Sequence, residues 1–251
     1  MLNIEYTDLV TPSQVADLSM DTLGDQITAA MRQTIGSGDT EAQQIQQAAL
    51  KQIKAASSQI DQFLNRKLVI NLATTYSSSG VWMEAPEFML PNDPQKWRMY
   101  FKQFPVVQVL SADDDTDLAG EVAIMGDAAD MAVCDLDGDL TQLPTRVAAF
   151  AGFKRYDIDA PASGETWNTV MSTSKLTGLD ESVVLEDVPA DICQVCATIV
   201  IAQLRWQFKE LIGVTESSMS ADRMSFSSRK QVKGFVEDQL ESLRRHRKTP
   251  F

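Results

Sequence analysis

The sequence predicts an α+β fold in which amino-terminal and carboxy-terminal helices form a helical bundle, with a large, mostly antiparallel β-rich domain inserted between them. Residues 13–66 and 189–247 carry apolar residues at spacings of three and four, which is typical of amphipathic helices. Residues 67–188 instead carry short alternating apolar runs separated by Gly, Pro and Asp, which is typical of strands and turns. Hairpins joined by such turns imply antiparallel pairing.

Charge is the unusual feature of the composition. The 251 residues are 44% hydrophobic, which is ample for a core, but the net charge is −13. Such a charge argues against general affinity for nucleic acid, because neutralising phosphates requires clustered Lys and Arg. Two interpretations of the acidic surface stay open: it prevents unwanted association, or it lets DNA slide past without sticking.

The cysteines and the apolar runs indicate a protein made and used in a reducing cytoplasm. Cys134, Cys193 and Cys196 are odd in number, and two of them lie inside a predicted helix, so a secreted disulfide framework is not expected. Residues 1–5 lack the basic and then apolar order of a signal peptide. No apolar run approaches the roughly 20 residues that cross a bilayer, so we expect no membrane association.

The first 66 residues predict three helices. Ser13 follows Pro12 and is a candidate cap of the first helix, and Asp21 is a candidate start of the second. Thr40 and Gln43 have the capping-box spacing at the start of the third, which is the longest. One apolar face of this third helix is expected to pack against the rest of the protein, and its main packing residues are Ile45, Ile53, Ile60 and Phe63.

The β-rich stretch contains at least five candidate strands. Leu68, Ile70 and Leu72 alternate with polar or small residues, as in a half-buried strand. The other candidates are residues 81–90, 104–110, 121–125 and 146–156, with a short last one at 167–171.

The carboxy-terminal part predicts two more helices. Pro189 occupies the first turn of a helix that Gly213 ends, and which should be the most buried helix of the chain. Its main packing residues are Ile192, Ile199, Leu204 and Phe208. Residues 214–228 are polar and Ser-rich, which indicates a mobile or partner-ordered linker. A final amphipathic helix is expected from Arg229 to about His246.

These elements predict three functional parts. Residues 1–66 with 189–213 form a helical core, residues 67–188 form the β-rich insertion, and residues 214–251 form a linker and a basic carboxy-terminal helix. Residues 229–251 carry a net charge of +4. Because the whole chain carries −13, residues 1–228 carry −17. This asymmetry predicts that the basic end meets an acidic surface.

No residue pattern predicts an active site, a metal site or a cofactor. Cys193 and Cys196 have the CxxC spacing of redox motifs, but no thioredoxin-like pattern precedes them, so we interpret them as buried structural cysteines. The acidic runs at 113–117 and 135–139 lack the glycine and glutamate positions of a calcium loop and are interpreted as turns. His246 lies in the basic end without a nearby nucleophile in the sequence.

The basic end is the main candidate site. The candidate docking residues are Arg244, Arg245, Arg247 and Lys248, with Phe251 as a possible apolar anchor. Docking into an acidic protein groove is the favoured role, with contact to DNA phosphates and an unengaged solvated tail as open alternatives.

Several stretches, taken in order, carry a family resemblance. They are the residues 11–18 (TPSQVADL), the helix end at 60–66 (IDQFLNR), Phe104-Pro105-Val106-Val107, Ala151-Gly152-Phe153, the helix start at 188–192 (VPADI), the polar linker and the final Arg244-Arg245. In this order and spacing the chain resembles the head-to-tail adaptor proteins of tailed bacteriophages, also called head-completion or connector proteins.

The resemblance implies a structural virion protein. Members of that family form a homo-oligomeric ring, commonly twelve-fold, beneath the portal protein. The ring extends the channel through which double-stranded DNA passes non-specifically, and it presents a docking surface to the next neck or tail-completion protein. By this resemblance the helices build the ring wall, residues 214–251 are the docking arm, and the protein is assembled in the host bacterial cytoplasm and resides in the virion neck.

Two other classes of function stay open from the residues alone. The first is a stand-alone acidic β-domain that binds a ligand, with calcium as a candidate. The second is an enzyme with a carboxylate pair that no spacing singles out.

Overall fold

The structure of the chain is a computed structural model. The described residues are 8–19, 22–34, 36–70, 74–77, 81–84, 96–101, 104–112, 122–125, 131–135, 146–153, 185–208 and 228–247. The chain divides into two compact units, Met1–Asn65 with Val188–Phe251 and Arg66–Asp187. The first is called the helical unit below and the second the β unit.

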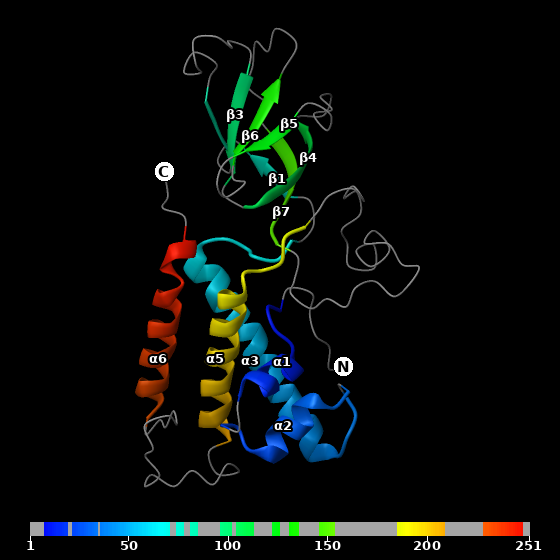
Figure 1. The fold of residues 1–251 in the computed structure, drawn as a ribbon, viewed down its shortest axis with the longest axis vertical. Helices are drawn as coiled ribbons and strands as arrows, with labels where there is room; N and C mark the ends of the chain where they lie inside the picture. Colours follow the sequence, from blue (N-terminus) through cyan, green and yellow to red (C-terminus); the bar gives the residue numbers. More distant parts are fainter. Residues whose placement is uncertain are drawn as a thin grey trace. The chain divides into compact units, whose positions relative to one another are not determined.

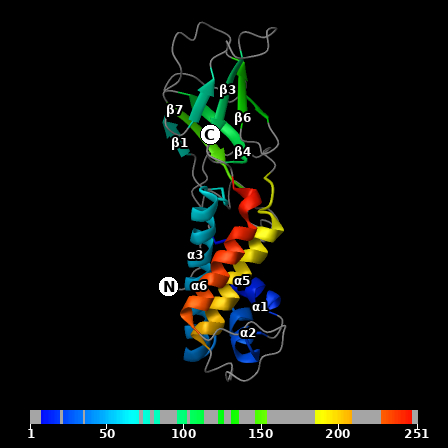
Figure 2. The same ribbon diagram turned by 90° about the vertical axis from the view of Figure 1, so that its left-hand side faces the viewer.

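Three long helices lie side by side in the helical unit (Figures 1 and 2). Its elements are α1 (Pro12–Leu18), α2 (Asp25–Arg32), α3 (Thr40–Leu64), α5 (Ala190–Gln207), α6 (Arg229–Ser242) and the 3-10 helix η2 (Arg244–His246). The helix α5 contacts α3, α6 and α1, while α2 packs on α3 and α1. Because α3 and α6 run in one direction and α5 in the other, α3 and α6 end where α5 begins (Figure 1).

The core of the helical unit lies between α3 and α5. Six of the eight packing residues that the sequence suggested are at most 1% exposed, namely Ile45, Ile53, Ile60, Ile192, Ile199 and Leu204. Phe63 and Phe208 differ, because both are only half-buried. Phe208 is the residue that ends α5, and Phe63 lies one position before the last residue of α3.

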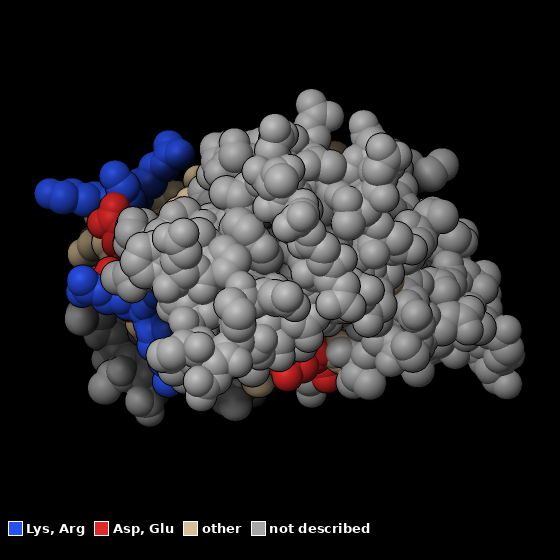
Figure 3. Space-filling view, turned by 90° about the horizontal axis from the view of Figure 1, so that it is seen from above, with Lys and Arg blue, Asp and Glu red and all other residues tan. Residues whose placement is uncertain are grey.

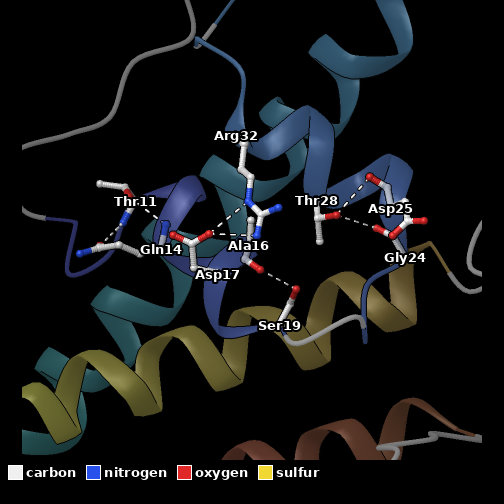
Figure 4. Close-up of polar contacts among 9 residues, drawn as sticks. All are labelled: Thr11, Gln14, Ala16, Asp17, Ser19, Gly24, Asp25, Thr28 and Arg32. Atoms are coloured by element: carbon white, nitrogen blue, oxygen red, sulfur yellow. Dashed lines mark hydrogen bonds and ion pairs between the residues drawn. The ribbon is translucent and has the colours of Figure 1, made fainter.

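The starts of the first three helices differ from the predicted ones by one to four residues, whereas α6 begins at Arg229 as predicted. Thr11, not Ser13, caps α1: its Oγ1 accepts from the Gln14 N–H (3.2 Å) while its own N–H donates to Gln14 Oε1 (2.8 Å; Figure 4). Asp39, not Thr40, caps α3 by accepting from the Ala42 N–H at 2.8 Å. A capping side chain must reach the free N–H groups from outside the first turn, and Thr40 is already helical.

The two short helices are joined by polar contacts. The second begins at Asp25, after Gly24 with a φ of 77°, rather than near Asp21. An ion pair of 3.0 Å joins Arg32 of α2 to Asp17 of α1, and Ser19 Oγ donates to the Ala16 carbonyl at 2.7 Å (Figure 4). The Arg32–Asp17 pair is exposed to solvent, whereas the contact between Ser19 and Ala16 is buried.

The described residues of the β unit form two antiparallel sheets. Its strands are β1 (Thr74–Ser77), β2 (Val81–Glu84), β3 (Lys96–Phe101), β4 (Val106–Ala112), β5 (Val122–Met125), β6 (Met131–Asp135) and β7 (Arg146–Ala151). One sheet has the order β1-β7-β4 and the other β2-β3-β6-β5. Each pair of neighbouring strands in these sheets is antiparallel.

The strands differ from the sequence prediction in several places. The segment 68–72 contributes a bridge at Val69 to Phe153, and the strand itself comes later, at β1. The prediction missed β3 and β6, although Trp97, Met99 and Phe101 alternate with more polar residues in β3. The acidic run at 135–139 was interpreted as a turn, but Asp135 is the last residue of β6. Residues 167–171 lie outside the described residues.

A buried arginine connects separate segments of the β unit. Arg66, 5% exposed, follows α3 in the chain, and its Nη1 donates to the Phe104 carbonyl at 3.0 Å. Its guanidinium carbon lies 3.5 Å from the centre of the Phe104 ring and 5.6 Å from that of Phe153. Stacking on aromatic faces and a carbonyl contact stabilise a cation that burial alone would destabilise.

Gly152 allows these segments to approach one another. Its N–H donates to the Pro105 carbonyl (2.7 Å), and the next N–H, of Phe153, donates to the Leu68 carbonyl (2.7 Å). Gly152 has a φ of 131°, and a Cβ there would lie 2.6 Å from the backbone nitrogen of Ile70. Only glycine fits this position. The residues Arg66, Phe104, Pro105, Gly152 and Phe153 are called the Arg66 cluster below.

The α+β class of the whole chain and its division into three functional parts stay predictions. The described residues leave out 154–184, in the predicted insertion, and 209–227, in the predicted linker.

We predict that Gly152→Ala destabilises the β unit by at least about 2 kcal/mol, because the added methyl would meet backbone atoms and the positive φ would be strained. Urea unfolding followed by circular dichroism measures the change. Gly234→Ala is the matched control. Gly234 lies inside α6 with open space around it, so the same substitution should stabilise by about 0.5–1 kcal/mol. Equal effects of the two substitutions would contradict the close approach at Gly152.

We also predict that Arg66→Lys destabilises the β unit by about 1–3 kcal/mol, since an ammonium group cannot stack on the Phe104 ring while donating to the Phe104 carbonyl. The same unfolding experiment applies, with the exposed Arg229→Lys as control. Unchanged stability of the Arg66→Lys protein would show that charge alone is needed at this position.

Candidate functional site

The described part of the basic end, up to residue 247, is folded onto the helical unit. After α6 the chain turns at Leu243, which is 1% exposed, and continues as η2. The N–H groups of His246 and Arg247 donate to the carbonyls of Leu243 and Arg244 at 2.9 and 3.0 Å. This turn therefore holds the basic side chains at defined positions.

One carboxylate of α5 binds two of these side chains. Asp191, in the first turn of α5, has its Oδ2 2.6 Å from Arg245 Nη2 and 2.6 Å from His246 Nε2. The side chain of Asp191 is 32% exposed, that of His246 21% and that of Arg245 70%. The contact is thus partly shielded from water. Asp191, Arg245 and His246 are called the Asp191 latch below.

The surroundings of Asp191 favour its ionised form. Partial burial by itself would raise the pKa of the carboxyl group, but the hydrogen bonds from Arg245 and His246 and the positive charges of the two outweigh it. The pKa of Asp191 therefore lies below its ordinary value. Its place in the first turn of a helix, where a negative charge is favoured, acts in the same direction.

The neighbouring basic residues have contacts of their own. Arg247 places its guanidinium carbon 5.7 Å from the centre of the Phe63 ring of α3, within cation–π range. Arg244 pairs with Glu241 at 3.1 Å, and this pair contributes little to stability because both side chains are exposed to water. Lys248 and Phe251, the other two candidate docking residues, lie outside the described residues.

The outward surface of α6 is highly charged. Arg229, Lys230 and Lys233 occupy its first part, and Lys233 pairs with Glu237 at 3.7 Å. Figure 3 shows described Lys and Arg side chains, interleaved with Asp and Glu, on the side where α6 lies in Figure 1. This surface, with the guanidinium groups of η2, suits carboxylate-bearing partners.

The two cysteines of the CxxC motif are buried thiols. Burial raises the pKa of Cys196 to about 12, so its thiol is not ionised at neutral pH. Ser57 Oγ accepts from the Leu9 N–H at 3.0 Å and lies 3.7 Å from Cys196 Sγ, and Cys193 Sγ lies 3.6 Å from the Leu9 carbonyl. These contacts attach the segment before α1 to α3 and α5, which is a packing role.

Within the described ranges no group of three or more His, Cys, Asp and Glu side chains is arranged to hold a metal ion. Of the two acidic runs, residues 113–117 and 136–139 lie outside the described residues. Likewise, among the helices that the structure describes, none combines the length and the apolar character needed to cross a bilayer.

Sequence reasoning missed the partner of His246. Asp191 and His246 are separated by 55 positions in the chain, and nothing in either local sequence links them. The Arg66 cluster was likewise present in the sequence only as separate stretches.

Comparison of the chain with family models, with curated proteins and with solved structures gives no match.

We predict that Asp191→Asn destabilises the helical unit by about 0.5–1.5 kcal/mol near neutral pH, since it removes a charge-assisted contact to two basic side chains. The folded-state pKa of Asp191 is lowered, so the contribution is complete above the ordinary pKa of about 3.9 and is lost as the pH falls through the lower folded-state value. Urea unfolding of both proteins from about pH 6 to about pH 3 should show the difference shrinking towards zero. A difference that grows on acidification would contradict the assignment.

Proposed function

We propose that this protein is a structural component of a tailed-bacteriophage virion, a head-to-tail adaptor that forms an oligomeric ring under the portal protein. In this role it extends the DNA channel and offers a docking surface to the next neck or tail-completion protein. It acts without a catalytic site or a cofactor, and it is assembled in the host bacterial cytoplasm.

The Arg66 cluster is the observation that carries this proposal. Three of the stretches that gave the family resemblance meet in one set of contacts: the one that ends at Arg66, the one that begins at Phe104 and the one that contains Gly152. They are far apart in the sequence, and their contacts give these stretches a common structural role, which supports the resemblance.

The basic end supports the docking part of the proposal. A closed ring requires two different complementary faces on each subunit. The exposed Arg244, Arg245 and Arg247 form a basic face, whereas residues 1–228 carry a charge of −17. Electrostatic attraction between such faces favours the correct orientation of neighbours and speeds their encounter.

The acidic character of the body suits a channel for DNA. A duplex that must pass without stopping is repelled by carboxylates, because tight binding of its phosphates requires clustered Lys and Arg. In the proposed ring DNA passes non-specifically, and binding energy is concentrated in protein–protein contacts.

We predict rings in negative-stain electron micrographs of the pure protein, either alone or mixed with the portal protein encoded by the same genome. A twelve-fold ring is the expected form. Removal of residues 229–251 should weaken the rings, because it removes the basic face. The triple variant Arg244→Glu, Arg245→Glu and Arg247→Glu should weaken them in the same way without shortening the chain.

The matched control exchanges Arg229, Lys230 and Lys233, at the other end of α6, for glutamate. If rings form equally well in both triple variants, Arg244, Arg245 and Arg247 are not part of the interface between subunits. Monomers in both samples, with no co-purification with the portal protein, would contradict the adaptor. Thermal stabilisation by calcium would then point to the ligand-binding class, and turnover that is lost on changing one carboxylate would point to an enzyme.

A further inference from the structure

We infer that the Asp191 latch is an autoinhibitory contact: it holds the carboxy-terminal arm, α6 with η2, against the subunit's own helical unit, and a carboxylate-bearing protein surface must displace it for the arm to dock. This inference rests on the proposed function, and it adds a control step that the family resemblance does not supply.

The first observation is that docking residues are already engaged within the chain. Arg245 and His246 both contact Asp191 Oδ2 at 2.6 Å, and Arg247 lies over the Phe63 ring. These contacts reach the start of α5 and the end of α3, which are both parts of the core helices. A partner that binds the same guanidinium groups must compete with them.

The second observation is that few apolar side chains of the arm are buried. Of the α6 residues, all of which the structure describes, only Val232 and Val236 are buried, and Leu243 is buried just beyond it. In α5, by contrast, ten of eighteen residues are buried. Local opening occurs most readily where few apolar groups are buried, so α6 with η2 is the part of the helical unit that should open first. Gly234, which weakens a helix interior, acts in the same direction.

The third observation concerns the chemistry of the partner. Asp191 presents one carboxylate to a guanidinium and an imidazole, and a carboxylate on a partner would replace it group for group. Such an exchange keeps the guanidinium and the imidazole paired with a carboxylate, while Asp191, whose side chain is 32% exposed, is left to water. An acidic protein surface therefore releases the latch at a smaller free-energy cost than a neutral surface, which would leave Arg245 and His246 without any carboxylate.

The latch predicts a quantitative link between opening and binding. If only the open form docks, the apparent affinity is reduced by the fraction of molecules that are open. A change that raises the open fraction without touching the docking residues should raise the affinity by the same factor. Asp191→Asn is that change, because Asp191 belongs to the closed form alone.

The experiment first measures opening without any partner. Hydrogen–deuterium exchange, followed by mass spectrometry on the full chain, should show residues 229–247 exchanging roughly three- to tenfold faster in Asp191→Asn, while α3 keeps its protection. The double variant Arg245→Gln with His246→Gln should reproduce this effect without altering α5. The matched charge control is Asp238→Asn, an exposed carboxylate on α6, which should leave exchange unchanged.

The second measurement is binding of the wild-type protein and of Asp191→Asn to the portal protein. The expected result is a gain in affinity by the same factor as the gain in exchange. Faster exchange with unchanged or weaker portal binding would overturn autoinhibition. Faster exchange in Asp191→Asn but not in the double variant would also overturn it, since the effect would then come from the start of α5.

Two further outcomes separate the latch from the proposed function. If neither protein binds the portal, the adaptor proposal fails, and the exchange data alone decide whether the latch exists. If Asp191→Asn gains affinity for a short DNA duplex and not for the portal protein, the released arm binds phosphate groups. The proposal that its partner is a carboxylate-bearing protein surface is then wrong.

Discussion

The buried guanidinium of Arg66 is the constraint on which the β unit depends. A cation removed from water destabilises a fold unless groups around it replace the lost hydration. Here the Phe104 ring and the Phe104 carbonyl replace part of the hydration of the Arg66 guanidinium, and the Phe153 ring lies near the same guanidinium. Because Phe104 precedes β4 and Phe153 follows β7, the arginine fixes where two paired strands lie with respect to the first residues of the unit. Gly152 then allows the backbones to approach closely enough for hydrogen bonds.

The helical unit combines a deeply buried core, between α3 and α5, with the helix α6, which buries few apolar side chains. The core between α3 and α5 is apolar and almost fully excluded from water, so it contributes most of the free energy of folding through the hydrophobic effect. The helix α6 adds a narrow apolar seam and a polar closure at Asp191. Hydrophobic burial is hard to exchange for another contact, whereas a carboxylate–guanidinium pair is replaced by an equivalent pair at small cost. In the proposed function, this difference would let one unit provide both a stable scaffold and an arm that is available for docking.

The helices were easier to predict from the sequence than the strands, for a physical reason. Helical periodicity repeats over many turns in α3 and α5, so one misplaced residue changes little, and the errors lay at the helix ends. Thr11 and Asp39 are the caps in place of Ser13 and Thr40, and α5 ends at Gln207, before the predicted Gly213. The strands span four to seven residues, too few for alternation to stand out. The segment at β3 alternates as a strand should, yet it follows a run rich in Pro and Asn that resembles one long loop.

The sequence by itself determined the local features: where helices run, which of their faces are apolar, that the chain is acidic and its end basic, and that Cys193 and Cys196 lie within a helix. These follow from neighbours in the chain, whose spacing is visible in the letters. Only the tertiary structure decided that Asp191 meets Arg245 and His246, that Arg66 stacks on Phe104, and that Gly152 must be glycine. Each of these contacts joins residues at least 38 positions apart. Such pairings depend on how whole elements pack, and no local pattern encodes them.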